Sequence, residues 1–283
     1  MTTFSSYDGT RLFFNEVGDG PPLLCLPGGP GRASAYLEDL GGLSSDRTLV
    51  LLDGRATGRS EVPADPSTLR FDRLADDVEA LRVQLGLDTA DVLAHSAGTM
   101  VAQAWASAHP ERVRSMVLVT PSGRLQGSGR DDVPDLVAAR RDEPWFPDAR
   151  EALDALETAP PSQQQMLWRA VRPFLYGRWD ERTQAHAATA DSQVSKRAEL
   201  GFAPTRDADV NIAALVAGLA SVTAPVLVIG GERDALTGVA AVHAVAESFP
   251  FARTAVLSRA GHFPWVDEGA VFADAVRDFL AGV

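Results

Sequence analysis

The sequence predicts an α/β fold in which a mostly parallel sheet has helices on both faces and carries an inserted helical region. Short apolar runs alternate with stretches whose apolar residues recur at helical spacing. Such alternation is typical of parallel sheets with reactive loops at the carboxyl ends of the strands. Between residues 122 and 212 the pattern changes to charged helical segments interrupted by prolines. A length of 283 residues, 45% of them hydrophobic, suits one large core with an insertion.

The expected strands are apolar runs bounded by glycine or polar residues. In chain order they are Arg11–Val17, Leu23–Leu26, Thr48–Leu52, Ala90–Leu93, a strand ending at Val119, Val226–Ile229 and Thr254–Leu257. We expect Arg11–Val17 at the edge of the sheet. The expected helices are Thr99–His109 and two others whose apolar faces consist of Leu74, Val78, Leu81, Leu85, Phe272, Val276, Phe279 and Leu280.

The chain is expected to divide into a core, residues 1–121 and 213–283, and a helical cap (lid), residues 122–212. Helices inserted at the carboxyl edge of a sheet cover the loops there. An apolar pocket with few polar groups is the usual ligand site, and we expect about half of the cap aromatics to face it. The predicted substrate-binding residues are Trp145, Phe146, Trp168, Tyr176 and Trp179.

The pentapeptide Ala94–Gly98 lies between an expected strand and an expected helix and has Ser96 at its centre. A tight turn at such a place lifts a serine hydroxyl clear of the backbone, and small flanking residues let strand and helix approach. Ser96 is therefore the candidate nucleophile, which needs a base to remove its proton. The alternative is that Ser96 only caps the helix, a common role for serine at this position.

A candidate acid and a candidate base follow in the chain order that this arrangement requires. Asp234 lies in the loop after Val226–Ile229, and Glu232 in the same loop is the alternative acid. His262 follows the last expected strand and is the candidate base. A neutral imidazole there would accept the serine proton, while the carboxylate would fix its tautomer and stabilise the imidazolium.

The other four histidines are assigned different places. His109 is expected at a helix end, His186 and His243 lie in helical stretches, and His95 is expected to point away from the nucleophile. No two histidines have the i, i+4 spacing with a glutamate that is typical of zinc sites, so we predict no metal site and no cofactor.

A glycine-rich loop, Pro27–Gly31, follows the apolar run Leu23–Leu26. Glycines there permit backbone N–H groups to approach a developing oxyanion, and the predicted donors are the N–H groups of Gly29 and Ala97. The alternative is a phosphate cradle, but the loop lacks the third glycine of a dinucleotide fingerprint and a Gly-Lys-Ser/Thr sequence.

These segments together resemble the α/β-hydrolase superfamily, and within it the proline iminopeptidase group. Pro27–Gly31 is similar to its His-Gly-Gly-Pro-Gly loop, and Asp53–Ser60 to its Asp-Gln-Arg-Gly-x-Gly-x-Ser segment. The turn at Ser96 and the Gly-His pair ending at His262 complete the resemblance, which implies the fold and a Ser-His-Asp triad. Arg55, within the second segment, is expected to organise loops by bonding backbone carbonyls.

The sequence departs from the peptidase group at the site. Ala97 stands where that group has tryptophan after its serine, and Pro27 stands where it has histidine. The nearest match to the acids that hold a substrate ammonium in that group is Trp179–Glu181, and a solvated helix end is the alternative for this segment.

We therefore predict a serine hydrolase that forms an acyl-enzyme on a small ester, lactone or amide. The alternatives are a proline iminopeptidase-type aminopeptidase, a hydrolase of carbon–carbon bonds, and, from a different class, a non-catalytic small-molecule-binding protein with the same fold.

Composition limits the partners. A formal charge of −12 and a pI near 4.8 argue against nucleic acid and anionic membranes, which leaves a small-molecule substrate. Cys25, the one cysteine, is expected to be buried as a small hydrophobe. The first residues lack the basic and apolar regions of an export signal, and no apolar run approaches membrane-spanning length, so a cytoplasmic protein is expected.

Overall fold

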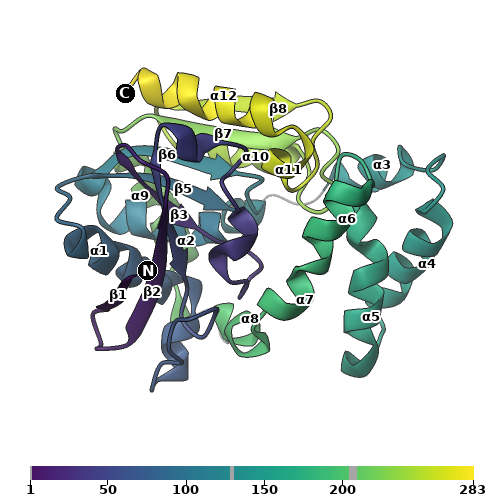
Figure 1. Ribbon diagram of the computed structural model, residues 1–283, viewed down its shortest axis with the longest axis horizontal. Coiled ribbons are helices and arrows are strands. Elements are labelled where there is room, and N and C mark those ends of the chain that lie inside the picture. Colours follow the sequence, from purple (N-terminus) through teal and green to yellow (C-terminus); the bar gives the residue numbers. More distant parts are fainter. Residues whose placement is uncertain (1, 128–130, 204–208) are drawn as a thin grey trace.

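A computed structural model describes residues 2–127, 131–203 and 209–283, which form an α/β structure around one sheet (Figure 1). The described strands are β1 (Thr2–Ser5), β2 (Arg11–Val17), β3 (Pro22–Leu26), β4 (Thr48–Asp53), β5 (Ala90–His95), β6 (Val113–Val119), β7 (Val226–Gly231) and β8 (Ala252–Leu257). Their order in the sheet is β1-β2-β4-β3-β5-β6-β7-β8. The first two strands run antiparallel to their neighbours, and every later pair is parallel, so the predicted fold class is confirmed.

The edge of the sheet differs from the prediction. Thr2–Ser5 pairs antiparallel with β2, so Arg11–Val17 is the second strand and not the edge. The extra strand is held by one large side chain, because Phe4 is buried and its ring centroid lies 5.9 Å from that of Phe14. A single aromatic residue among polar neighbours gives no alternating pattern, which explains why the sequence did not reveal this strand.

Helices cover both faces of the sheet. The core helices are α1 (Phe71–Gln84), α2 (Gly98–Ala108), α9 (Ile212–Gly218), α10 (Ala240–Ala246), α11 (Pro264–Asp267) and α12 (Gly269–Ala281). One apolar cluster joins the sheet to α1, α2 and α10, and a second joins it to α11, α12 and the 3₁₀ helix Ser34–Leu37. Successive strand residues alternate between the clusters: Leu24 lies in the first and Leu23 in the second. The strands are therefore apolar on both faces.

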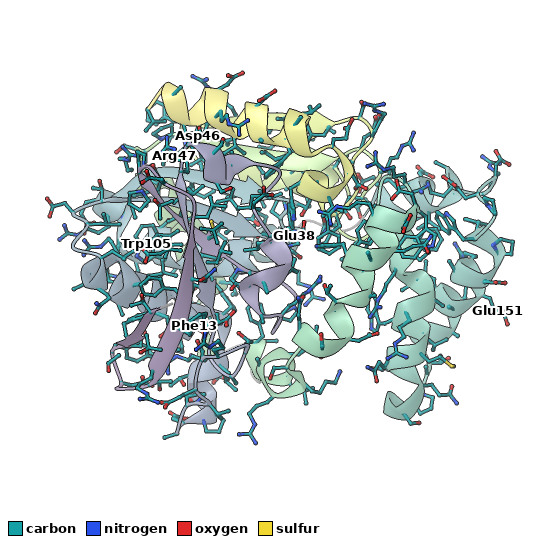
Figure 2. The ribbon with its side chains drawn as sticks, viewed as in Figure 1. Phe13, Glu38, Asp46, Arg47, Trp105 and Glu151 are labelled. Carbon is teal, nitrogen blue, oxygen red and sulfur yellow. The ribbon has the colours of Figure 1, made fainter. Side chains whose placement is uncertain are left out.

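Trp105 of α2 is the largest side chain that is fully buried among the described residues (Figure 2). Its indole N–H donates to a carboxylate oxygen of Glu79 on α1, at 3.1 Å. The contact satisfies the one polar atom of a large apolar group, as buried tryptophans require. It thereby fixes the helix that follows Ser96 against its neighbour.

The inserted region consists, where described, of helices beyond the carboxyl edge of the sheet (Figure 1). They are α3 (Val133–Ala138), α4 (Phe146–Leu156), α5 (Pro161–Val171), α6 (Glu181–Ala188), α7 (Ala190–Gln193) and α8 (Lys196–Phe202). Val133, Val137 and Ala152 contribute to an apolar cluster of their own. Glu38, labelled in Figure 2, pairs with Arg182 of α6 and links this region to the core. We propose that residues 122–212 act as a cap.

Arg55 acts within the core, although not through the predicted partners. Its guanidinium is fully buried and bonds the carboxylates of Asp77 and Asp8 and the hydroxyl of Thr68, instead of backbone carbonyls. Asp77 belongs to α1 and Asp8 to the turn after β1, so one arginine joins three segments.

In the described ranges, no helix is both long and apolar enough to span a membrane.

Replacing Arg55 tests this interpretation. In Arg55→Met the buried carboxylate of Asp77 loses its cation, so we expect a loss of about 3–5 kcal/mol in the free energy of unfolding. Urea denaturation followed by circular dichroism measures it. Arg150→Ala removes an exposed ion pair with Asp154 on α4 and is the control, with an expected change below about 1 kcal/mol. Equal losses in the two variants would contradict the assignment.

Candidate active site

Ser96 lies in a tight turn between β5 and α2. Its φ of +53° is in the left-handed region, which non-glycine residues seldom adopt outside constrained sites. Small neighbours make the turn possible, because a Cβ at Gly98 would lie 2.5 Å from the carbonyl oxygen of Pro27. The helix has no side-chain cap, so Ser96 does not serve as the N-cap that the sequence left open.

The structure brings the three predicted side chains together. His262 Nε2 lies 2.9 Å from Ser96 Oγ, and His262 Nδ1 lies 2.8 Å from Asp234 Oδ2. Ser96 follows β5, Asp234 follows β7 and His262 follows β8, so the carboxyl ends of three strands position them. Glu232, the alternative acid, is exposed. The arrangement can move a proton from a hydroxyl to an imidazole whose opposite nitrogen faces a carboxylate.

Asp234 is fully buried and still favours the charged form. Burial raises its pKa, but the facing ring of His262 and hydrogen bonds from His262 and Thr237 outweigh this, and the pKa lies below its usual value. The Thr237 hydroxyl donates at 2.6 Å, and the N–H groups of Leu236 and Thr237 donate to the other carboxylate oxygen. A carboxylate with this many donors can orient an imidazole without taking its proton.

The glycine-rich loop lies directly against the serine. A Cβ at Gly28 would lie 2.8 Å from Ser96 Cβ, so glycine is required for this approach. The N–H of Gly28 donates to the Tyr36 hydroxyl at 2.7 Å. Among the described residues, no hydrogen bond uses the N–H groups of Gly29 and Ala97. The two predicted donors therefore have no competing hydrogen bond, and their role in binding an oxyanion stays a prediction.

A family model of the alpha/beta hydrolase fold matches residues 21–268 of this chain. The chain belongs to the α/β-hydrolase family. A proline iminopeptidase from Heyndrickxia coagulans is 36% identical over 108 residues, which span 38% of this chain and 38% of that protein. The match therefore covers well under two thirds of that relative.

Two longer matches agree with the family. A pimeloyl-(acyl-carrier protein) methyl ester esterase from Chromobacterium violaceum is 27% identical over 276 residues, covering 95% of this chain and 98% of that protein. The solved structure of a proline iminopeptidase from Mycobacterium smegmatis has a TM-score of 0.75 at 22% identity, with 99% of this chain and 98% of that one covered. The structural match shows that this α/β hydrolase shares its fold.

A second set of contacts, which the sequence did not predict, holds the backbone of His262. His95 Nε2 lies 2.9 Å from the carbonyl oxygen of His262, and His95 Nδ1 lies 2.7 Å from the Tyr36 hydroxyl. Burial, together with the adjacent ring of His262, holds the pKa of His95 well below its usual value, so this ring is neutral. Its Nε2–H then donates to the carbonyl, and its Nδ1 accepts from Tyr36. Tyr36 and His95 therefore connect the loop at Gly28 to His262.

The predicted cap aromatics lie in different surroundings. Trp145 and Phe146 pack against Phe174, with ring centroids 5.0 and 5.8 Å away. Tyr176 is buried and stacks on Phe263, next to His262. Trp179 packs on Tyr176, and Trp168 is 44% exposed. A role of these aromatics in substrate binding stays a prediction.

A cavity of about 40 Å³ adjoins the glycine-rich loop of this α/β hydrolase. It is lined by Gly28, Gly31 and Arg32 of the loop and by Ala198 and Phe202 of α8, among others, and by none of the five predicted aromatics. Phe202 lies at the end of α8, and no motif in the sequence marks this position. In the ranges that the structure describes, no cluster of three or more His, Cys, Asp or Glu side chains could hold a metal ion.

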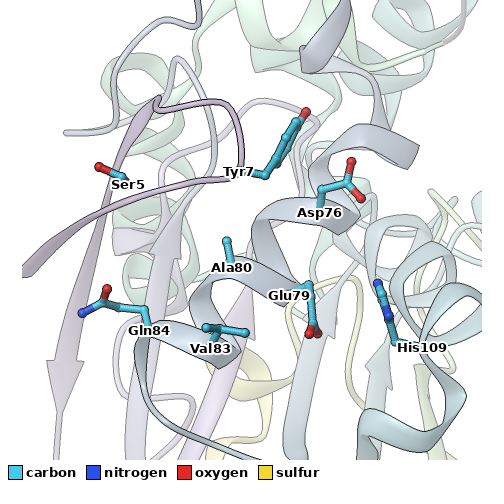
Figure 3. Close-up of a pocket in the computed structure, with 8 residues that line it drawn as sticks. All are labelled: Ser5, Tyr7, Asp76, Glu79, Ala80, Val83, Gln84 and His109. Atoms are coloured by element: carbon cyan, nitrogen blue, oxygen red, sulfur yellow. The ribbon is translucent and has the colours of Figure 1, made fainter.

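A larger pocket of about 670 Å³ lies along α1, beside Ser5 of β1 and His109 at the end of α2 (Figure 3). Tyr7, Asp76, Glu79 and His109 are among its lining residues. Its acids already have partners, because Asp76 pairs with Arg73, and Glu79 pairs with Arg82. The residues that line this pocket include none of the Ser96 site, so pocket volume alone does not identify the candidate active site.

Asp267 connects the inserted region to the loop that carries His262. Its Oδ2 accepts from the N–H of Gly177 at 2.9 Å and from the N–H of Gly261 at 2.8 Å. Burial raises the pKa of Asp267 to about 6, although these two donors oppose the shift. This role was not predicted from the sequence, because Gly177 is 90 residues away along the chain.

This carboxylate predicts a pH dependence of stability. The folded chain binds its proton more tightly than the unfolded chain, whose pKa is near 3.8, so the contribution is present below about pH 4 and is lost as the pH rises through about 6. We expect Asp267→Asn to flatten the decline of Tm across this window. Thermal melts at closely spaced pH values measure it. Asp274→Asn, which removes an exposed carboxylate on α12, is the control, and an unaltered slope in Asp267→Asn would refute the assignment.

Proposed function

We propose that this protein is a serine hydrolase with Ser96 as nucleophile, His262 as base and Asp234 as the orienting acid. The observation that supports it most strongly is the unbroken chain of contacts from Asp234 Oδ2 through His262 to Ser96 Oγ, at 2.8 and 2.9 Å. Each contact is within the range that proton transfer requires. The family and its esterase and iminopeptidase relatives agree with this chemistry.

The proposed reaction has two halves. Ser96 Oγ attacks the acyl carbonyl carbon while His262 Nε2 takes the hydroxyl proton, and the carbonyl oxygen becomes an oxyanion facing the N–H groups of Gly29 and Ala97. The bond to the leaving group then breaks, and His262 gives that group its proton. Water, deprotonated by the same imidazole, releases the acid from the acyl-enzyme and restores the Ser96 hydroxyl.

The proposed substrate is a small ester and not a peptide with a free amino terminus. A peptidase of this kind needs an acid to hold the ammonium group, and Trp179–Glu181 contains the nearest match. Asp180 there accepts from the N–H of Thr183 as the N-cap of α6 and pairs with Arg178. Because this carboxylate already has partners, a simple ester, which has no ammonium group that must be held, fits better.

Substitution of the nucleophile tests the proposal. Ser96→Ala is expected to lower kcat for 4-nitrophenyl butyrate by a factor of about 10⁴ or more, because no acyl-enzyme forms. Ser221→Ala removes an exposed serine and is expected to change nothing. Labelling with a phosphonofluoridate should reach one equivalent in the wild type and none in Ser96→Ala. Full turnover by Ser96→Ala would exclude the mechanism, and a panel with prolyl anilide and lactone substrates would separate the peptidase and lactonase alternatives.

The acid has a test of its own. In Asp234→Asn the amide donates to His262 Nδ1 and forces the proton onto Nε2, which can then no longer accept from Ser96. We expect kcat to fall by about 10⁴ while the fold is kept. Glu232→Gln, in the same loop, should stay within about twofold of the wild type, since its side chain is exposed. Steady-state rates on one ester compare the two, and the reverse pattern would make Glu232 the acid.

A further inference from the structure

Arg32 differs from the other buried arginines in having no anionic partner. Among the described residues, four arginines are buried: Arg32, Arg55, Arg82 and Arg140. Arg55 bonds Asp77, Arg82 bonds Glu79 and Arg140 bonds Glu143. The guanidinium of Arg32 bonds only neutral oxygens, at 3.0 Å to Gln193 Oε1 and at 2.9 Å to Thr189 Oγ1. Its remaining nitrogen, Nη1, makes no hydrogen bond to any described residue.

The charges around Arg32 do not replace the missing carboxylate. Glu38, whose charge favours the protonated form of Arg32, is already paired with Arg182. Arg172 adds a second positive charge that opposes it. Burial lowers the pKa of Arg32, because no neighbouring anion outweighs it. The pKa of Arg55, which is paired with carboxylates, is raised. Burying a cation without a counter-ion is costly, and proteins seldom keep one without a use for it.

Arg32 lies over two aromatic rings that adjoin the candidate active site. It follows Gly31 in the glycine-rich loop and lines the cavity that this loop shares with α8. Its guanidinium carbon lies 4.1 Å from the ring centroid of Tyr36, whose hydroxyl accepts from Gly28, and 5.7 Å from that of Phe263, the residue after His262. Tyr36 therefore connects the cation to the glycine-rich loop, and Phe263 connects it to the segment that carries His262.

We propose that Arg32 binds a carboxylate of the substrate, so that the preferred esters carry a negative charge on the acyl part. This inference rests on the proposed function and names its substrate class. Gln193 and Thr189 occupy only two of the three guanidinium nitrogens, and an arginine fork matches a carboxylate better than any other side chain does. The bound anion supplies the counter-ion that the chain itself lacks.

A purely structural role is the competing explanation. Arg32 bonds α7 through Gln193, and the N–H of Ala33 donates to the carbonyl of Gln193, so the side chain also fastens the loop to the cap. A residue that only holds the loop in place affects all substrates alike, because that loop carries a proposed oxyanion donor. A carboxylate-binding residue acts on charged substrates alone. The ratio of rates for matched esters therefore separates the two roles.

The experiment compares 4-nitrophenyl hemiglutarate, whose acyl chain ends in a carboxylate, with 4-nitrophenyl pentanoate, which is neutral. The wild type should have the higher kcat/KM on the charged ester. In Arg32→Gln that value should fall about 10- to 100-fold, as expected for the loss of a hydrogen bond to a charged group, with little change on the neutral ester. Arg32→Lys should recover part of the loss, because it restores the charge without the fork. Arg169→Gln removes an exposed cation of the cap and is the control.

A binding measurement provides a readout without turnover. Glutarate at constant ionic strength should raise the Tm of the wild type and of Arg169→Gln, but not that of Arg32→Gln. Equal losses on both esters in Arg32→Gln, or no preference of the wild type for the charged ester, would overturn the inference and leave the hydrolase standing. Failure of the proposed function looks different: the wild type would cleave neither ester, and the phosphonofluoridate would not label Ser96.

Discussion

The close contact between the loop at Pro27 and the turn at Ser96 constrains the rest of the site. Two missing β-carbons allow it, since one at Gly28 would lie 2.8 Å from Ser96 Cβ and one at Gly98 would lie 2.5 Å from the Pro27 oxygen. The turn at Ser96 and the glycine-rich loop thereby share one edge of the sheet. Because packed interiors resist deformation, folding sets this contact before any substrate arrives, as the oxyanion site that we propose would require.

Two separate chains of polar contacts hold His262. One reaches its ring from Asp234, whose pKa burial raises and whose interactions with His262 and Thr237 lower it below the usual value. The other reaches its backbone carbonyl from His95 and Tyr36. Ring and backbone are therefore fixed independently, so the imidazole can gain and lose a proton while its position is kept. Arg32 lies over Tyr36 and places the unpaired cation against this second chain.

Much of the fold and the three candidate catalytic residues could be predicted because each of the latter follows an apolar run, and a strand pattern is local in sequence. The residues that were missed have partners far along the chain: Tyr36 meets His95, and Asp267 meets Gly177. No local spacing encodes such pairs. Arg55 shows the intermediate case, since its structural role was expected, but the acids that hold it come from remote segments.

The sheet order has a consequence for the inserted helices. β6 and β7 are parallel neighbours, so the chain must cross from the carboxyl edge, where β6 ends at Val119, to the amino edge, where β7 begins at Val226. On this crossing, α9 contacts the 3₁₀ helix Gly123–Gln126 that follows β6, so the inserted helices leave the core and re-enter it at adjoining points. Whatever length of polypeptide lies between them imposes no stretch on the strands. A lineage could enlarge, shorten or replace that excursion and change which molecules are admitted, while Ser96, Asp234 and His262 kept their mutual distances.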